Sequence, residues 1–162
     1  MKLTGSVFFR MPTVLKILKL DHANDIELPS YGLEGNSGMD LRAAVSAPVV
    51  INPSERALIP TGIRIFFPFG YEGQIRSRSG MAASNGVVVL NSPGTIDSCY
   101  QGEIKVILIN LSDKSFVIDR GMRIAQLVVA RVETCDIIEV NELEIPNKTD
   151  RSDNGFGSTG ML

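Results

Sequence analysis

The chain has few of the residues on which many active sites depend. Its 162 residues include one histidine, His22, and two cysteines, Cys99 and Cys135, without the CxxC spacing of a zinc or redox site. A metal cluster or a Ser-His-Asp triad would have to be built around that one imidazole, and no GxSxG motif accompanies it. Such sites are close to excluded, and we interpret His22 as a surface residue beside Asp21.

Excess charge of one sign and long apolar runs are also lacking. Sixteen Lys and Arg against 18 Asp and Glu leave a net charge of -2, without the basic stripe that binding to a nucleic-acid polymer requires. The apolar runs are strand-sized, shorter than the roughly 18 residues of a membrane span. The block "LTGSVFF" is too short for a signal peptide. We therefore expect a soluble, cytoplasmic protein with no membrane or nucleic-acid partner.

Short runs of β-branched and apolar residues are what the sequence does contain. "APVVIN", "EGQIRSRSG", "GVVVLN", "GEIKVILINL", "RIAQLVVARVE" and "CDIIEV" are examples, separated by Gly, Pro, Asn, Asp and Ser. This pattern predicts an all-β sandwich or barrel. One helical turn is expected at 79–84. "GEIKVILINL" is apolar on both faces, which favours an oligomer.

The length predicts a single domain. We expect it to span residues 1–146, with 1–13 as an N-terminal extension and either Met1 or Met11 as the start. After Pro146 the composition becomes polar and Gly-rich. Residues 147–162 are therefore expected to form a mobile carboxyl-terminal arm.

The stretch "NSPGTIDSCYQGEIKV", residues 91–106, is predicted to be a hairpin-like loop because Pro and Gly turn the chain before a strand. Asp97 and Tyr100 are expected on its rim. Asp97 is either a turn former or a general base whose proton affinity rises when a pocket partly desolvates it.

A second stretch, "RSRSGMAA", offers either a capped turn or a phosphate site. Ser79 and Gly80 enter the expected helical turn, where free backbone N–H groups favour an anion, and Arg78 adds a fixed charge. No GxxxxGK or GxGxxG motif is present, so a nucleotide would be held without a P-loop or Rossmann unit.

Three further features are weak alone. Asp40 lies just before an expected strand, and Gln126 interrupts an apolar one. A buried Gln must be hydrogen-bonded, so Gln126 either ties the core together or faces a polar site. "RSDNGFGSTG" is typical of a solvated tail, although Phe156 stands between two glycines.

Together and in this order, these five stretches resemble the motifs of the trimeric all-β dUTPases, over residues 36–160. The matching residues are Asp40, then Arg78, Ser79 and Gly80, then Asn91, Gly94, Ile96, Asp97, Tyr100 and Gly102, then Gln126, then Arg151 with "GFGSTG". The resemblance implies a distorted β-barrel or jelly roll with one short helix. It also implies a homotrimer with intersubunit active sites.

The activity implied by this resemblance is hydrolysis of dUTP to dUMP and pyrophosphate, which limits uracil in DNA and supplies dUMP for thymidylate synthesis. Asp97 would be the catalytic residue that deprotonates the attacking water. Mg2+ on the triphosphate would be held through water by Asp40. The implied substrate-binding residues are Arg78, Ser79, Gly80, Asn91, Gly94, Thr95, Ile96, Tyr100, Lys105, Gln126, Arg151, Phe156, Gly157, Ser158 and Thr159.

In the resembling enzymes the tyrosine at the Tyr100 position stacks on deoxyribose and excludes a 2'-hydroxyl, while the arm closes with Phe156 on the uracil. Two alternatives stay open. One is a dCTP deaminase, which shares the fold but carries a catalytic Glu where this chain reads "KVILIN". The other is a trimeric nucleotide-binding module without turnover.

Overall fold

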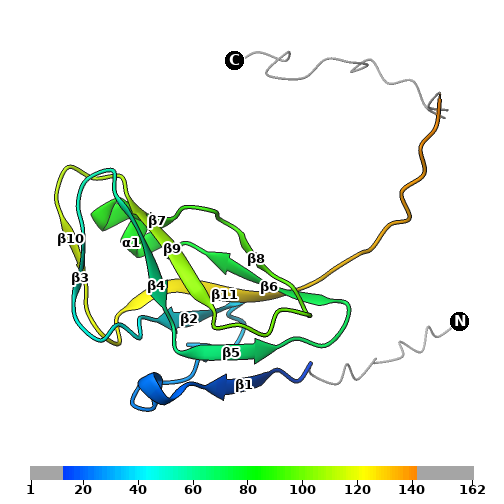
Figure 1. Cartoon of the computed structure of the whole chain (residues 1–162), viewed down its shortest axis with the longest axis horizontal. Coiled ribbons are helices and arrows are strands. Elements are labelled where there is room, and N and C mark those ends of the chain that lie inside the picture. The colour runs from blue at the N-terminus through cyan, green and yellow to red at the C-terminus, as the bar shows by residue number, and fades with distance from the viewer. Residues whose placement is uncertain (1–12, 142–162) are drawn as a thin grey trace, which may run out of the picture.

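The computed structural model describes residues 13–141, which form antiparallel strands and one α-helix (Figure 1). The all-β prediction is confirmed. The elements are β1 (Lys16–Lys19), a 3-10 turn η1 (Asp21–Ala23), β2 (Gly38–Arg42), β3 (Val49–Ile51), β4 (Arg56–Pro60), β5 (Ile63–Phe66), β6 (Tyr71–Arg76), α1 (Ser79–Asn85), β7 (Val87–Val89), β8 (Gly94–Ile96), β9 (Lys105–Asn110), β10 (Phe116–Ile118) and β11 (Arg123–Arg131).

The strands form small antiparallel sheets rather than one large one. A four-stranded sheet has the order β2-β11-β6-β8, and a three-stranded sheet has the order β4-β9-β7. The pairs β1-β5 and β10-β3 complete the fold. The long strand β11 is central, because Leu127 pairs with Met39 of β2 on one side and with Ile75 of β6 on the other.

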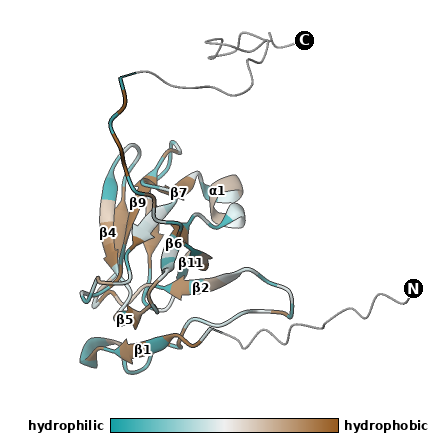
Figure 2. Ribbon diagram, turned by 90° about the vertical axis from the view of Figure 1, so that its right-hand side faces the viewer, coloured by the Kyte–Doolittle hydropathy of each residue, from teal (hydrophilic) through white to brown (hydrophobic). Residues whose placement is uncertain are grey.

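The core lies between these sheets. Alternate strand residues point to opposite faces, so each strand contributes its inward set. Leu41, Ile59, Leu108 and Leu127 are fully buried in one cluster. Hydrophobic residues are concentrated in strands such as β4 and β9, and β1 carries two of them, Ile17 and Leu18, between two lysines (Figure 2).

The predicted helical turn is confirmed, and α1 extends one residue further than expected, to Asn85. Gly86 ends it with φ 65°, a left-handed conformation that glycine adopts without a Cβ clash. The Gly86 N–H donates to the Ala82 carbonyl at 3.0 Å. The helix therefore ends one residue beyond the predicted end, directly before Gly86.

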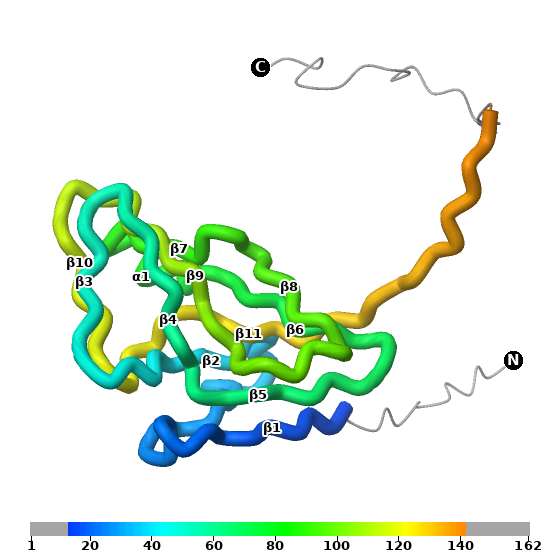
Figure 3. Tube along the Cα trace, in the orientation of Figure 1, coloured from blue at the N-terminus to red at the C-terminus, as the bar shows by residue number. Residues whose placement is uncertain are grey.

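Two expectations are wrong. The strands flanking residues 97–104 do not pair as a hairpin: β8 pairs with β6, and β9 pairs with β4 and β7, so the loop connects two sheets. The run 135–140 forms no strand either. It lies in segment 132–141, which leaves the sheets (Figure 3). A strand needs a partner, and within the described chain the run 135–140 pairs with no strand.

The predicted arm at 147–162 and residues 1–12 of the predicted extension lie outside the described residues. Between residues 13 and 141 the chain contains no helix with the length and hydropathy of a membrane span.

Candidate active site

Asp40 lies at the centre of a polar group on β2 and β11. In the sheet register it faces Gln126, whose amide Nε2 lies 3.4 Å from Oδ1 of Asp40. Arg78 donates from Nε to the same oxygen at 3.1 Å, and Arg123 donates from Nη1 to Oδ2 at 3.3 Å. We call these four residues the Asp40 cluster. Two guanidinium groups against one carboxylate leave it with a net positive charge, which suits a phosphate ligand.

The start of α1 belongs to the same region. Arg78 is the residue before the helix, and its Nη1 also donates to the Arg123 carbonyl at 3.1 Å. Ser79 and Gly80 follow it directly. The structure thus brings three predicted residues, Asp40, Arg78 and Gln126, into contact. Gln126 is half-buried and faces the polar site rather than tying the core together.

Arg123 is a member of the cluster that sequence reasoning missed. Residues three apart on a regular strand point to opposite faces, so Arg123 and Gln126 would not both be expected to reach Asp40. A register shift between Arg123 and Ala125 changes this. Such an irregularity re-aims a side chain, and no sequence signal marks it here.

A second group surrounds Asp97. The Tyr100 N–H donates to the Asp97 carbonyl at 3.1 Å, so these residues share one turn. A pocket of about 280 Å3 lies beside it. We call this the Asp97 pocket; it is lined by Leu58, Thr95, Ile96, Asp97, Tyr100, Glu103, Lys105 and Ile107.

Five predicted residues meet in this pocket, namely Thr95, Ile96, Asp97, Tyr100 and Lys105. The Asp97 side chain is exposed in the single chain, so the desolvation expected for it does not come from the described residues themselves.

Asn91 lies in the turn that leads into β8, and Gly94 is the first residue of that strand. A Cβ on Gly94 would lie 3.2 Å from Nδ2 of Asn91 and 3.3 Å from Cβ of Ile75. That spacing is tight, so glycine allows Asn91 and β6 to approach the strand closely. Neither residue is among those that line the Asp97 pocket.

Glu103, Leu58 and Ile107 line the pocket but were not predicted. The sequence indicated Glu103 only weakly as a site residue, through its position between the predicted residues Tyr100 and Lys105. Leu58 had no such signal, because β4 is distant in sequence from Asp97, and Ile107 faces Leu58 across β4 and β9.

The Asp40 cluster and the Asp97 pocket share no residue. The predicted residues Arg151, Phe156, Gly157, Ser158 and Thr159 lie outside the described part of the chain.

For metal binding, residues 13–141 hold no group of three or more His, Cys, Asp and Glu side chains suited to an ion. Asp40 is a single carboxylate, and a carboxylate accepts about four hydrogen bonds in total. Its Oδ2 accepts one from Arg123, which leaves room for a metal-bound water. The residues therefore fit a Mg2+ that arrives with a polyphosphate and touches the protein through water.

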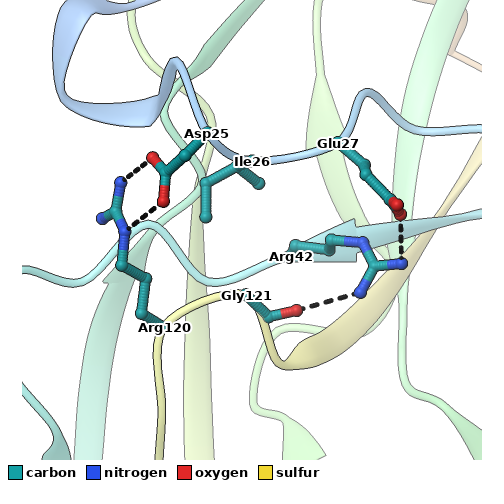
Figure 4. Close-up of a pocket in the computed structure, with 6 residues that line it drawn as sticks. All are labelled: Asp25, Ile26, Glu27, Arg42, Arg120 and Gly121. Atoms are coloured by element: carbon teal, nitrogen blue, oxygen red, sulfur yellow. Dashed lines mark hydrogen bonds and ion pairs between the residues drawn. The ribbon is translucent and has the colours of Figure 1, made fainter.

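Another pocket, of about 380 Å3, is bridged by ion pairs (Figure 4). Arg42 donates to Glu27 at 2.6 Å and to the Gly121 carbonyl at 3.0 Å. Arg120 hydrogen-bonds Asp25 and lowers the pKa of that carboxyl to about 2. Both guanidinium groups are engaged, so these contacts hold the loop after η1 onto the sheets.

Solved structures and curated relatives share this fold and its sequence. The structure of Staphylococcus bacteriophage 80alpha dUTPase with dUpNHpp superimposes with a TM-score of 0.80 at 28% identity, over 91% of this chain and 98% of that one. The match defines a dUTPase-like all-β protein.

Curated deoxyuridine 5'-triphosphate nucleotidohydrolases are more similar in sequence. That of Aquifex aeolicus is 54% identical over 91% of this chain and 96% of its own length. That of Caldanaerobacter subterraneus subsp. tengcongensis is 53% identical over 93% and 100%. A family model described as dUTPase matches residues 24–160. The chain belongs to the dUTPase family.

Proposed function

We propose that the protein hydrolyses dUTP to dUMP and pyrophosphate, through in-line attack of a water molecule on the α-phosphorus. Its family membership supports this, and the observation that carries it is the turn that places Asp97 and Tyr100 side by side in one pocket. Asp97 orients the water and accepts its proton as the bond to phosphorus forms and pyrophosphate leaves. The reaction limits uracil in DNA and supplies dUMP.

The position of β8 at the edge of its sheet allows it to distinguish uracil from other bases. This strand is at the edge of its sheet and pairs only with β6 among the described strands, so its outer backbone groups are free to bond a flat ligand. We assign recognition of the uracil edge to the backbone at Thr95 and Ile96. The Tyr100 ring, held by a 2.9 Å hydrogen bond from its hydroxyl to the Glu103 carbonyl, would exclude a 2'-hydroxyl.

We assign binding of the phosphates to the Asp40 cluster together with Ser79 and Gly80. Lys105 would contact the nucleotide from the rim of the Asp97 pocket. Mg2+ bound to the triphosphate would neutralise phosphate charge. A dUTPase of phage phi11 of S. aureus, which shares the fold at 24% identity, coordinates a structural Mg(II) ion. For this chain the proposal rests on Asp40, whose remaining lone pairs suit a metal-bound water.

We propose a homotrimer with active sites between subunits. The Asp40 cluster and the Asp97 pocket share no residue within one chain, so a partner would complete each site. Apolar surface supports this. Leu58 is 58% exposed on the outer face of β4, and Ile137 is 97% exposed in segment 132–141. Burying such surface favours association.

We propose that residues 147–162 close over the bound nucleotide, with Phe156 on the uracil and Arg151, Gly157, Ser158 and Thr159 near the phosphates. The glycines beside Phe156 permit close backbone approach. Residues 1–146 then form the domain that carries the rest of the site.

The test is pyrophosphate release with dUTP, UTP, dCTP and dTTP in the presence of Mg2+. We expect turnover of dUTP alone, and loss of turnover by about 100-fold or more in Asp97→Asn with dUTP affinity retained. Asp113→Asn, in the exposed turn after β9, is the matched control. Tight binding of dUTP without release would instead indicate a binding module, and ammonia release from dCTP would indicate a deaminase. β9 (Lys105–Asn110) carries no carboxylate for the latter.

A further inference from the structure

The Glu103 carboxylate connects three parts of the chain in the wall of the Asp97 pocket. Its side chain is only 15% exposed. Oε1 accepts a hydrogen bond from the Gly62 N–H at 2.8 Å and lies 3.1 Å from Nε2 of His22, while Oε2 lies 3.9 Å from Nζ of Lys105. Charge-assisted bonds to a half-buried carboxylate are stronger than neutral ones.

The turn that holds Glu103 is itself fixed. Gly62 has φ +68°, and a Cβ there would overlap the Cβ of Ala23, which is fully buried. The neighbouring Thr61 hydroxyl donates to the Ile104 carbonyl at 2.6 Å, and the Ile104 N–H donates to the Ile63 carbonyl at 2.9 Å. Glu103 is therefore anchored to a rigid part of the core.

From Glu103 the contacts lead to the predicted catalytic turn. Its backbone carbonyl accepts the Tyr100 hydroxyl at 2.9 Å, and the Tyr100 N–H bonds the Asp97 carbonyl at 3.1 Å. The link from the Gly62 turn to the Tyr100 ring thus runs through one residue.

We infer that Glu103 is a positioning residue that holds the Tyr100 ring at the sugar end of the pocket, so that discrimination between deoxyribose and ribose depends on it. The inference rests on the proposed function for the role of Tyr100. Glu103 does not touch the reacting atoms. A shift of about 1 Å in a positioning group can cost up to about 100-fold in rate, so loss of the anchor has a measurable effect.

The experiment compares Glu103→Ala, which removes the acceptor, with Glu103→Gln, whose amide oxygen can still accept the Gly62 N–H. Glu55→Ala is the matched control, because Glu55 also holds a turn, at Asn52, but lies outside the pocket. The readouts are kcat/KM for dUTP and UTP and, independently of turnover, the Kd of each nucleotide. The Kd ratio tests Glu103 even if the protein proves not to hydrolyse dUTP.

We expect Glu103→Ala to lower the dUTP-to-UTP ratio about tenfold or more, and Glu103→Gln and Glu55→Ala to keep it within about threefold. In a cycle with Tyr100→Phe, the double variant should lose little beyond the larger single loss, because both changes break one connection. A wild-type ratio in Glu103→Ala, or losses that simply add in the cycle, would overturn the inference. If Glu103→Ala does not fold, Glu103→Asp, whose carboxylate is one methylene shorter, takes its place: it must lower the ratio, and a wild-type ratio in Glu103→Asp would overturn the inference.

Discussion

Gly102→Ala is a sharp perturbation of the proposed site, because it adds one methyl group next to a pocket residue. Gly102 has no left-handed φ, so alanine fits its backbone conformation. A Cβ at this position would lie 2.6 Å from Cζ of Tyr100, and the hydroxyl oxygen is closer still. The change therefore acts on the Tyr100 ring and on little else.

The size of the effect follows from this contact. Carbon atoms in contact lie about 3.5–4.0 Å apart, so the tip of the ring must move by roughly 1 Å. That movement breaks the hydroxyl bond to the Glu103 carbonyl, worth about 1 kcal/mol, and misplaces the surface that faces the sugar. We expect kcat/KM for dUTP to fall about 10- to 100-fold.

The free energy of unfolding of Gly102→Ala should rise slightly or stay unchanged, although its activity falls. Replacing glycine by alanine at a compatible backbone position stabilises by about 0.4–1 kcal/mol through the unfolded state, which offsets the lost hydrogen bond. The assay is pyrophosphate release together with thermal unfolding. Gly32→Ala is the control, since a Cβ there meets only the Asn36 amide, at 3.3 Å. Unchanged kcat/KM in Gly102→Ala would refute the reasoning.

Three further predictions concern stability, pH and the arm. Gly62→Ala should cost about 3 kcal/mol in urea unfolding, because left-handed strain adds to the overlap with Ala23; a cost no larger than that of Gly70→Ala, at φ +81° in open space, would contradict this. Arg120 lowers the pKa of Asp25 from 3.8 to about 2, so the stability it contributes is present above pH 3.8 and is lost toward pH 2. In Asp25→Asn the urea midpoint should depend less on pH across that range. A pH dependence equal to that of the wild type would argue against the ion pair. Deleting residues 147–162 should abolish turnover without changing the unfolding midpoint, and a fully active truncated chain would rule out the lid.

Much of the fold and site could be predicted from the sequence because the signals are local. Alternating apolar runs show which residues share a face, and Gly86 shows where the helix ends. The residue types of the motifs, among them Asp40, Arg78 and Asp97, are equally local information. The sequence alone therefore determined the all-β class, the short helix and the candidate residues.

The tertiary structure decided how these pieces meet. The two-residue period of side chains along a strand shows which face of the sheet a residue occupies, but it does not show which strand lies beside it. The pairing of β8 with β6 rather than with β9 could therefore not be predicted from the sequence. The irregularity that turns Arg123 toward Asp40 depends on the register with β2. The contact of Glu103 with Gly62 joins residues 41 positions apart. Such contacts form only when the sheets pack, because long-range packing selects the partner that local sequence leaves open.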